Sequence, residues 1–229
     1  MNLGNAMSAA AKNKDIWDDI YASGGLLWYP AEALVRLVRR REREGGFPGV
    51  IFDHGCGSGN VAEFLVRSGH RVHCTDISPA ALRLLDQRFL GALLPRPSTS
   101  LIDVGRRLKP QLPAYDHCIA WQSLCYSDLA TAKANLADLI DGMPSGGVLI
   151  VNFPTPNDLL CRHSEPMADG SRQLIDNVSN QKGAIVTVPA SADELRAWCR
   201  KIVAQDVIEY GLTFAGERSE YYVLYGVKA

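Results

Sequence analysis

The chain has 229 residues, 47% of them hydrophobic, and a formal net charge of -1. This length supports one sizeable core but not two full domains, so we expect a single domain over residues 15–229 after a disordered lead over residues 1–14. A net charge near zero argues against a polyanionic partner such as nucleic acid. There is no apolar run long enough to cross a bilayer and no signal-peptide pattern, so we expect no membrane association and a cytoplasmic location.

Two helices are predicted in the N-terminal region. The first covers Asp15–Tyr21 and ends before two glycines, and the second runs from Ala31 to about Arg43 after a proline. Four aromatic residues lie in or between these helices: Trp17, Tyr21, Trp28 and Tyr29. They either dock the helices on the core or lie over a ligand cleft, and the sequence leaves both interpretations open.

Strands and helices alternate from Val50 to Phe153. The predicted strands cover residues 50–53, 70–76, 98–103, 115–121 and 148–153, and the predicted helices between them cover residues 60–68, 79–90 and 130–141. Such alternation is typical of a three-layer, doubly wound α/β fold, in which helices cover both faces of a mostly parallel sheet.

The alternation stops after Phe153. Residues 154–182 are polar and interrupted by prolines, and a connection of this length is usually a functional lid or disordered, so we expect an insert or lid here. A strand at 185–188, a helix at 191–202 and an antiparallel hairpin with its turn at 216–219 complete the prediction.

The most informative motif follows the first predicted strand. It reads Asp-His-Gly-Cys-Gly-Ser-Gly over Asp53–Gly59. Glycine tolerates positive φ and has no Cβ, so a ligand can approach the backbone of this loop closely. The carboxylate of Asp53 would repel the pyrophosphate of a dinucleotide, but it suits a cationic ligand that carries an ammonium and a sulfonium group. The motif therefore favours S-adenosylmethionine over NAD.

Two further carboxylates end the next two predicted strands. Asp76 lies 23 positions after Asp53, where an acidic side chain accepts the ribose hydroxyls in nucleoside-binding folds of this kind. Asp103 ends the third strand. Each aspartate alone fits an ordinary turn former or N-cap as well as a ligand contact, but their joint occurrence with the glycine motif supports a cofactor site.

The motif at residues 52–59 resembles the first motif of class I S-adenosylmethionine-dependent methyltransferases. Tyr115-Asp116, the Pro-Ser-Gly-Gly run at 144–147 and the final strand pair extend this resemblance over about residues 48–229. The N-terminal aromatic segment resembles that of bacterial small-molecule methyltransferases of polysaccharide and secondary-metabolite type.

The resemblance implies a Rossmann-like domain with a seven-stranded sheet and a C-terminal antiparallel hairpin. It also implies transfer of a methyl group from S-adenosylmethionine to an O or N atom of a small-molecule acceptor, which leaves S-adenosylhomocysteine. We expect a monomer or homodimer, with the N-terminal helices at 15–45 covering the cleft and residues 154–182 on the acceptor side.

Residue roles follow from the same resemblance. Asp103, beside Val104, matches an acidic residue that accepts from the adenine amino group, and Gln122 matches a residue on the sulfonium and methionine side. The expected cofactor-binding set is Trp17, Tyr21, Tyr29, Asp53, Gly55, Cys56, Gly57, Gly59, Asp76, Ile77, Asp103, Val104 and Gln122.

The acceptor chemistry is less defined by the sequence. Methyl transfer from a sulfonium needs mainly alignment and exclusion of water, although an oxygen acceptor can require a base. His163, in the predicted lid, is the candidate catalytic base. Gln122 and Asn152 are poor substitutes for the carboxylates that metal-assisted transfer needs, so we expect no metal. Two alternatives stay open: an NAD-linked oxidoreductase or epimerase on a related fold, and a catalytically silent partner protein that binds the cofactor.

Overall fold

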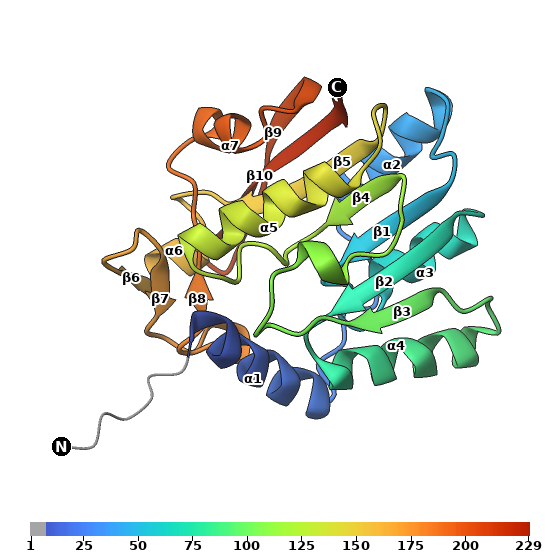
Figure 1. The fold of residues 1–229 in the computed structure, drawn as a ribbon. Helices are drawn as coiled ribbons and strands as arrows, with labels where there is room; N and C mark the ends of the chain where they lie inside the picture. Colours follow the sequence, from blue (N-terminus) through green and yellow to red (C-terminus); the bar gives the residue numbers. More distant parts are fainter. Residues whose placement is uncertain (1–7) are drawn as a thin grey trace.

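The computed structural model describes residues 8–229, apart from the side chain of Ala204, and its centre is a seven-stranded sheet (Figure 1). The strand order is β3-β2-β1-β4-β5-β10-β9, and only the last two strands run antiparallel to their neighbours. The strands are β1 Val50–His54, β2 Arg71–Asp76, β3 Ser98–Leu101, β4 His117–Ala120, β5 Val148–Pro154, β9 Ile202–Phe214 and β10 Glu217–Lys228. This order confirms the predicted α/β fold with a C-terminal antiparallel hairpin.

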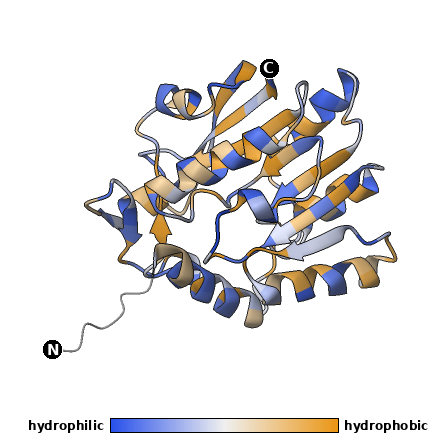
Figure 2. Cartoon of the chain, in the orientation of Figure 1, coloured by the Kyte–Doolittle hydropathy of each residue, from blue (hydrophilic) through white to orange (hydrophobic). Residues whose placement is uncertain are grey.

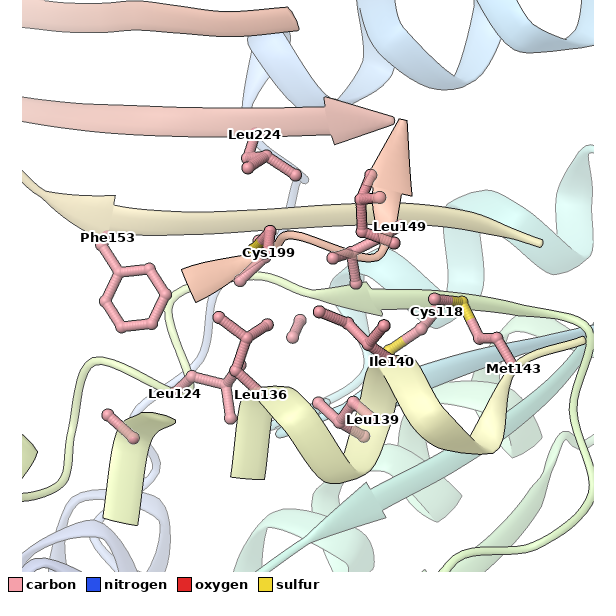
Figure 3. Close-up of a cluster of buried hydrophobic side chains, with 14 of the residues drawn as sticks. Cys118, Leu124, Leu136, Leu139, Ile140, Met143, Leu149, Phe153, Cys199 and Leu224 are labelled. Atoms are coloured by element: carbon pink, nitrogen blue, oxygen red, sulfur yellow. The ribbon is translucent and has the colours of Figure 1, made fainter. Parts of the chain in front are cut away.

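Helices cover both faces of this sheet. The helices are α1 Ala9–Ala22, α2 Glu32–Arg43, α3 Asn60–Arg67, α4 Pro79–Ala92, α5 Leu129–Gly142, α6 Leu159–Arg162 and α7 Ala192–Trp198, with short 3-10 turns η1 Lys109–Gln111 and η2 Val178–Asn180. Side chains of α2, α3 and α4 form one core on the sheet, and those of α5 and α7 form the other. Leu136, Leu139 and Ile140 of α5 belong to the same buried cluster as Leu149 of β5, and Figure 3 shows Ile140 facing Leu149. Residues three and four apart share one helix face.

The central strands are mostly apolar. Every residue of β4 and β5 is buried, as expected for strands that are covered on both faces. The edge strand β3 is mostly exposed and reads Ser-Thr-Ser-Leu, and it is correspondingly pale in Figure 2. Polar residues in the middle of the sheet include those at the carboxyl ends of β1 and β2, such as Asp53 and Asp76.

The predicted start of the ordered domain was wrong. Helix α1 begins at Ala9 with Ser8 as its N-cap, so residues 9–14 are helical, while residues 1–7 of the predicted lead lie outside the described residues. Tertiary contacts explain the longer helix. The buried Asn13 side chain donates to the carbonyls of Tyr126 and Ile185 and accepts from the Ile185 amide.

The third predicted strand also ends early. It stops at Leu101, because the Asp103 amide donates to the side chain of Gln111 instead of continuing the ladder. The C-terminal turn lies at Ala215-Gly216, two residues at positive φ that directly join β9 and β10, rather than at 216–219.

Residues 154–182 are structured. They contain α6, the strands β6 Ser164–Pro166 and β7 Arg172–Leu174, and η2. The two strands form a small antiparallel sheet with β8 Ile185–Val186, in the order β6-β7-β8. A separate apolar cluster that includes Leu160, Leu174 and Val186 stabilises this insert, which the polar sequence of the segment did not reveal.

Candidate functional site

The three glycines after β1 are required for three different contacts. Gly55, Gly57 and Gly59 all have left-handed backbone, with φ of 70°, 53° and 84°. A Cβ would overlap the Ser123 side chain at Gly55 and the Tyr21 hydroxyl at Gly57, and would lie 2.8 Å from Leu85 Cγ at Gly59. The first two glycines therefore let Ser123 and Tyr21 pack closely against the loop, while the third lets α3 pack against α4.

Hydrogen bonds fix the loop on the end of β2. The Gly55 and Cys56 amides both donate to the Thr75 carbonyl, at 2.8 and 2.9 Å. The Gly57 amide donates to Asp76 Oδ2 at 2.8 Å, and the Ser78 amide donates to Asp76 Oδ1 at 2.9 Å. Asp76 thus organises the loop in addition to facing a cavity.

Two buried carboxylates dominate the electrostatics. Burial, with a smaller contribution from the Asp76 charge, raises the pKa of Asp53 to about 7. Burial also raises the pKa of Asp76 to about 6, against the opposing effect of its backbone hydrogen bonds. Asp53 Oδ2 is buried and has no hydrogen-bond partner. A cationic group placed beside these carboxylates would stabilise their ionised forms.

Helix α1 covers the loop. Trp17 and Tyr21 stack with ring centroids 5.8 Å apart, and Trp17 meets Tyr126 edge-on at 4.8 Å. Asp18 Oδ1 accepts from Ser78 Oγ at 2.5 Å, which ties α1 to the start of α4. Figure 1 shows α1 lying beside α4 at one end and reaching β8 at the other.

Two cavities meet between α1 and the glycine loop. The small cavity has a volume of about 140 Å³ and includes His54, Asp76, Ile77, Asp103 and Val104 in its lining. The large cavity, of about 720 Å³, is lined by Asp53, Cys56 and Gly57, by Tyr29, and by residues of the insert and of β9 and β10. Both are lined by Trp17, Tyr21, Gly55, Gln122 and Tyr126.

The structure brings together nearly all of the predicted cofactor residues. Twelve of the thirteen line one or both cavities, and the exception is Gly59, which packs on Leu85. Trp17, Tyr21 and Tyr29 all reach the cavities, so the N-terminal aromatics both cover the cleft and dock α1. Gln122 adopts a positive φ of 50°, and its amide donates to Asn152 Oδ1 at 2.6 Å.

His163 is not brought to either cavity. Its Nδ1 lies 2.8 Å from Asp176 Oδ2 and its Nε2 lies 3.4 Å from Glu217 Oε2. The hydrogen bond with Asp176 is the main cause of the raised pKa of this imidazole. A histidine held between two carboxylates at the surface of the insert is placed for a structural contact, and its position does not support the role of catalytic base.

Three residues that line the large cavity were missed by sequence reasoning: Tyr126, Gln181 and Tyr221. Tyr126 follows β4 and Tyr221 lies on β10, where each looked like an ordinary core aromatic. Gln181 lies in the polar insert and carried no motif. Only the fold brings these three segments to one place.

The family comparison agrees with this geometry. Residues 52–149 match a family model described as a methyltransferase domain. The chain carries a methyltransferase domain of the class I fold. The predicted fold and the predicted enzyme class are confirmed, and the match begins at the glycine loop.

Solved structures similar to this methyltransferase include two enzymes that act on small molecules. Magnesium protoporphyrin IX methyltransferase of Synechocystis PCC 6803, with bound S-adenosylhomocysteine, is 18% identical with a TM-score of 0.65, covering 95% of this chain and 100% of that one. The 1,6-didemethyltoxoflavin N1-methyltransferase of Burkholderia thailandensis, with bound 1,6-didemethyltoxoflavin and S-adenosylhomocysteine, is 17% identical with a TM-score of 0.64, covering 100% of this chain and 93% of that one. No curated protein matches the sequence of this chain.

Two kinds of structural feature are absent from the described residues. Within residues 8–229, no group of three or more His, Cys, Asp and Glu side chains is arranged to hold a metal ion. None of the helices in the described part of the chain has the length and apolar character needed to span a membrane.

Proposed function

We propose that this enzyme transfers a methyl group from S-adenosylmethionine to an O or N atom of a small-molecule acceptor, as a monomer or homodimer. The observation that carries the proposal is the meeting of the two cavities at Gly55, Tyr21 and Gln122. A ligand that passes this junction would place its nucleoside in the small cavity and its methionine end in the large one.

The methionine end would lie against β1 and the glycine loop. Asp53, with one buried and unpartnered carboxylate oxygen, is positioned to bind the ammonium group. Gly55 and Gly57 present bare backbone to the cavity, and Gln122, which lines both cavities, would contact the sulfonium side. An ammonium ion beside Asp53 would replace the proton that burial otherwise favours on this carboxylate.

The adenosine end would lie against the ends of β2 and β3. Asp76 is assigned to the ribose hydroxyls and Asp103 to the adenine amino group, with Ile77 and Val104 lining the same cavity. Burial lowers the pKa of His54 to about 4, so this histidine is neutral beside the nucleoside and adds no charge to the site.

The proposed reaction needs alignment more than acid–base catalysis. The bond from carbon to sulfur breaks with its electron pair on sulfur, a lone pair of the acceptor forms the new bond, and any displaced proton leaves to water. Burial raises the pKa of both the Tyr126 and the Tyr221 phenol, so these groups act as neutral hydrogen-bond partners. Exclusion of water beneath α1 and orientation of the acceptor are then the protein's contributions.

The NAD-linked alternative is disfavoured by topology. Dinucleotide-binding folds have the order 3-2-1-4-5-6 with a parallel last strand, whereas β10 here inserts antiparallel between β5 and β9. The buried carboxylate of Asp53 would also face a pyrophosphate unfavourably.

Calorimetry with S-adenosylhomocysteine tests the cofactor assignment, and we expect one site per chain. Methyl transfer from labelled S-adenosylmethionine to a panel of small molecules tests the activity. Absence of binding would refute the proposal, while tight binding without turnover of any acceptor would support the alternative of a silent partner protein.

A further inference from the structure

We propose that the acceptor is an uncharged, largely aromatic molecule that binds in the outer part of the large cavity and donates a hydrogen bond to Gln181. This inference rests on the proposed function and specifies its substrate class. The outer part is the region bordered by Leu27, Tyr29, Leu160, Val178, Gln181 and Leu212, beyond the glycine loop.

The lining of the large cavity is mostly aromatic and aliphatic, with uncharged polar side chains that include Asn60, Ser179 and Ser219. Asp53 is the only charged side chain among its lining residues, and it lies at the cofactor end. No Lys, Arg or His within the described part of the chain lines this cavity. Its volume of about 720 Å³ falls in the range typical of small-molecule sites. A phosphate or carboxylate on the acceptor would lose its hydration there without gaining a cation.

Arginines near the rim are already engaged. Arg162 pairs with Glu217 at 2.9 Å, and Arg218 pairs with Glu220. Arg88 donates to the Leu27 and Trp28 carbonyls at 2.5 and 3.2 Å, which holds the apolar 26–29 loop at the mouth. These three arginines therefore bind groups of the protein itself, and none of them supplies a positive charge to the cavity.

Gln181 supplies the polar contact. Only 9% of this residue is exposed, and its Oε1 is buried without a hydrogen-bond partner. A contact between the Gln181 side chain and the Tyr126 phenol lowers the pKa of that phenol, against the larger raising effect of burial. Because buried polar atoms are nearly always paired, Gln181 Oε1 is matched to an N–H or O–H that the acceptor brings.

Backbone strain points to the same place. Ser179 and Asn180, directly before Gln181, have φ of 49° and 64°, and Gln122 across the cavity has φ of 50°. Non-glycine residues in this region are uncommon, and such strain concentrates at ligand sites. Five non-glycine residues among 8–229 have a positive φ, and three of them line the large cavity. The strained turn at Ser179 and Asn180 therefore positions the next residue, Gln181, in the cavity wall.

The test uses two probes that differ by one charge: N-phenyl-1-naphthylamine, which is neutral, and 1-anilinonaphthalene-8-sulfonate, which has the same rings and a sulfonate. Both are titrated by fluorescence into the protein saturated with S-adenosylhomocysteine, so that the cofactor region is filled. We expect the neutral probe to bind at least tenfold more tightly. Failure of S-adenosylhomocysteine to bind would refute the proposed function, whereas normal cofactor binding with equal or tighter sulfonate binding would overturn only the acceptor class.

Introducing a positive charge at position 181 tests whether this residue contributes to the preference for the neutral probe over the sulfonate probe. Gln181→Lys should narrow or reverse the preference, shifting the ratio of the two dissociation constants at least fivefold toward the sulfonate. Lys182→Gln is the control, since Lys182 is exposed and lies outside the cavity lining, and it should leave the ratio unchanged. An unchanged ratio in a Gln181→Lys protein that still binds S-adenosylhomocysteine, or no binding of the neutral probe to the native protein, would refute the role of Gln181.

Discussion

Replacing Asp53 with Asn should stabilise the ligand-free enzyme while weakening its cofactor site. Burial raises the pKa of Asp53 from 3.8 to about 7, a difference of about three units. At 1.36 kcal/mol per unit, holding this carboxylate ionised in the fold costs about 4 kcal/mol, which is an upper estimate. Asn has nearly the same shape and never ionises, so the substitution removes this cost.

The sign of the pH dependence follows from the direction of the shift. The folded state keeps the Asp53 proton that the unfolded chain releases above about pH 4, so the native protein loses stability as pH rises from 4 to 7. The stability gain of Asp53→Asn should therefore be small near pH 4 and full above pH 7. For a chain of this length, about 4 kcal/mol corresponds to a Tm increase of roughly 8–16 °C.

Thermal unfolding at pH 5 and pH 8 measures this difference. Asp15→Asn, which changes an exposed carboxylate of α1, is the control and should show no such gain. An Asp53→Asn gain that is equal at both pH values would refute ionisation of Asp53 as its source.

Cofactor binding should respond in the opposite sense. Asp53→Asn should weaken S-adenosylhomocysteine binding by roughly 1.5–3 kcal/mol, the scale of a charge-assisted hydrogen bond. In the native protein, affinity should fall by up to tenfold per pH unit below about pH 7, because the ligand's ammonium needs the ionised carboxylate. Calorimetry across pH 5–8 should show that the affinity of the variant for S-adenosylhomocysteine depends less steeply on pH. The pH dependence that is left would come from ionisation of Asp76. Identical slopes would contradict the assignment of Asp53 to the ammonium.

Three further predictions concern the residues that shape the site. Asp76→Ala should weaken S-adenosylhomocysteine binding by roughly 1.5–3 kcal/mol in calorimetry, since it loses the ribose contact and frees the Gly57 amide; unchanged affinity would contradict the role of Asp76. Gly57→Val should abolish S-adenosylhomocysteine binding, because the valine side chain would overlap the Tyr21 hydroxyl. Gly146→Ala, at a positive φ with no neighbouring atoms within 4 Å, is the control and should retain binding. Normal binding by Gly57→Val would contradict the assignment of the glycine loop to the cofactor. Asn13→Ala should lower the free energy of unfolding in urea by about 2–3 kcal/mol through unpaired buried groups, with exposed Asn177→Ala as its control; equal effects of the two would refute the anchoring of α1.

Local sequence patterns determined the core of the fold. The alternation of apolar strands and amphipathic helices between Val50 and Phe153 indicated a parallel sheet because each element carries its own periodicity. The glycine motif and the aspartates at the carboxyl ends of β1 and β2 indicated the cofactor site, since the carboxyl ends of neighbouring parallel strands meet at one edge of the sheet. Each of these signals is a local pattern at the end of one strand, so it can be read without knowing the remainder of the chain.

The acceptor side depended on the tertiary structure. The extra turns of α1 form because Asn13 bonds to Tyr126 and Ile185, which are 113 and 172 positions away, and no local propensity encodes such partners. The insert folds on its own small apolar cluster, and that packing takes His163 away from the cavities and brings Gln181 into one. Sequence by itself therefore indicated the methyl-donor half of the site, because its glycines and aspartates lie in local motifs at the ends of predicted strands. Only the tertiary structure decided the acceptor half, because its walls come from segments that meet through long-range packing.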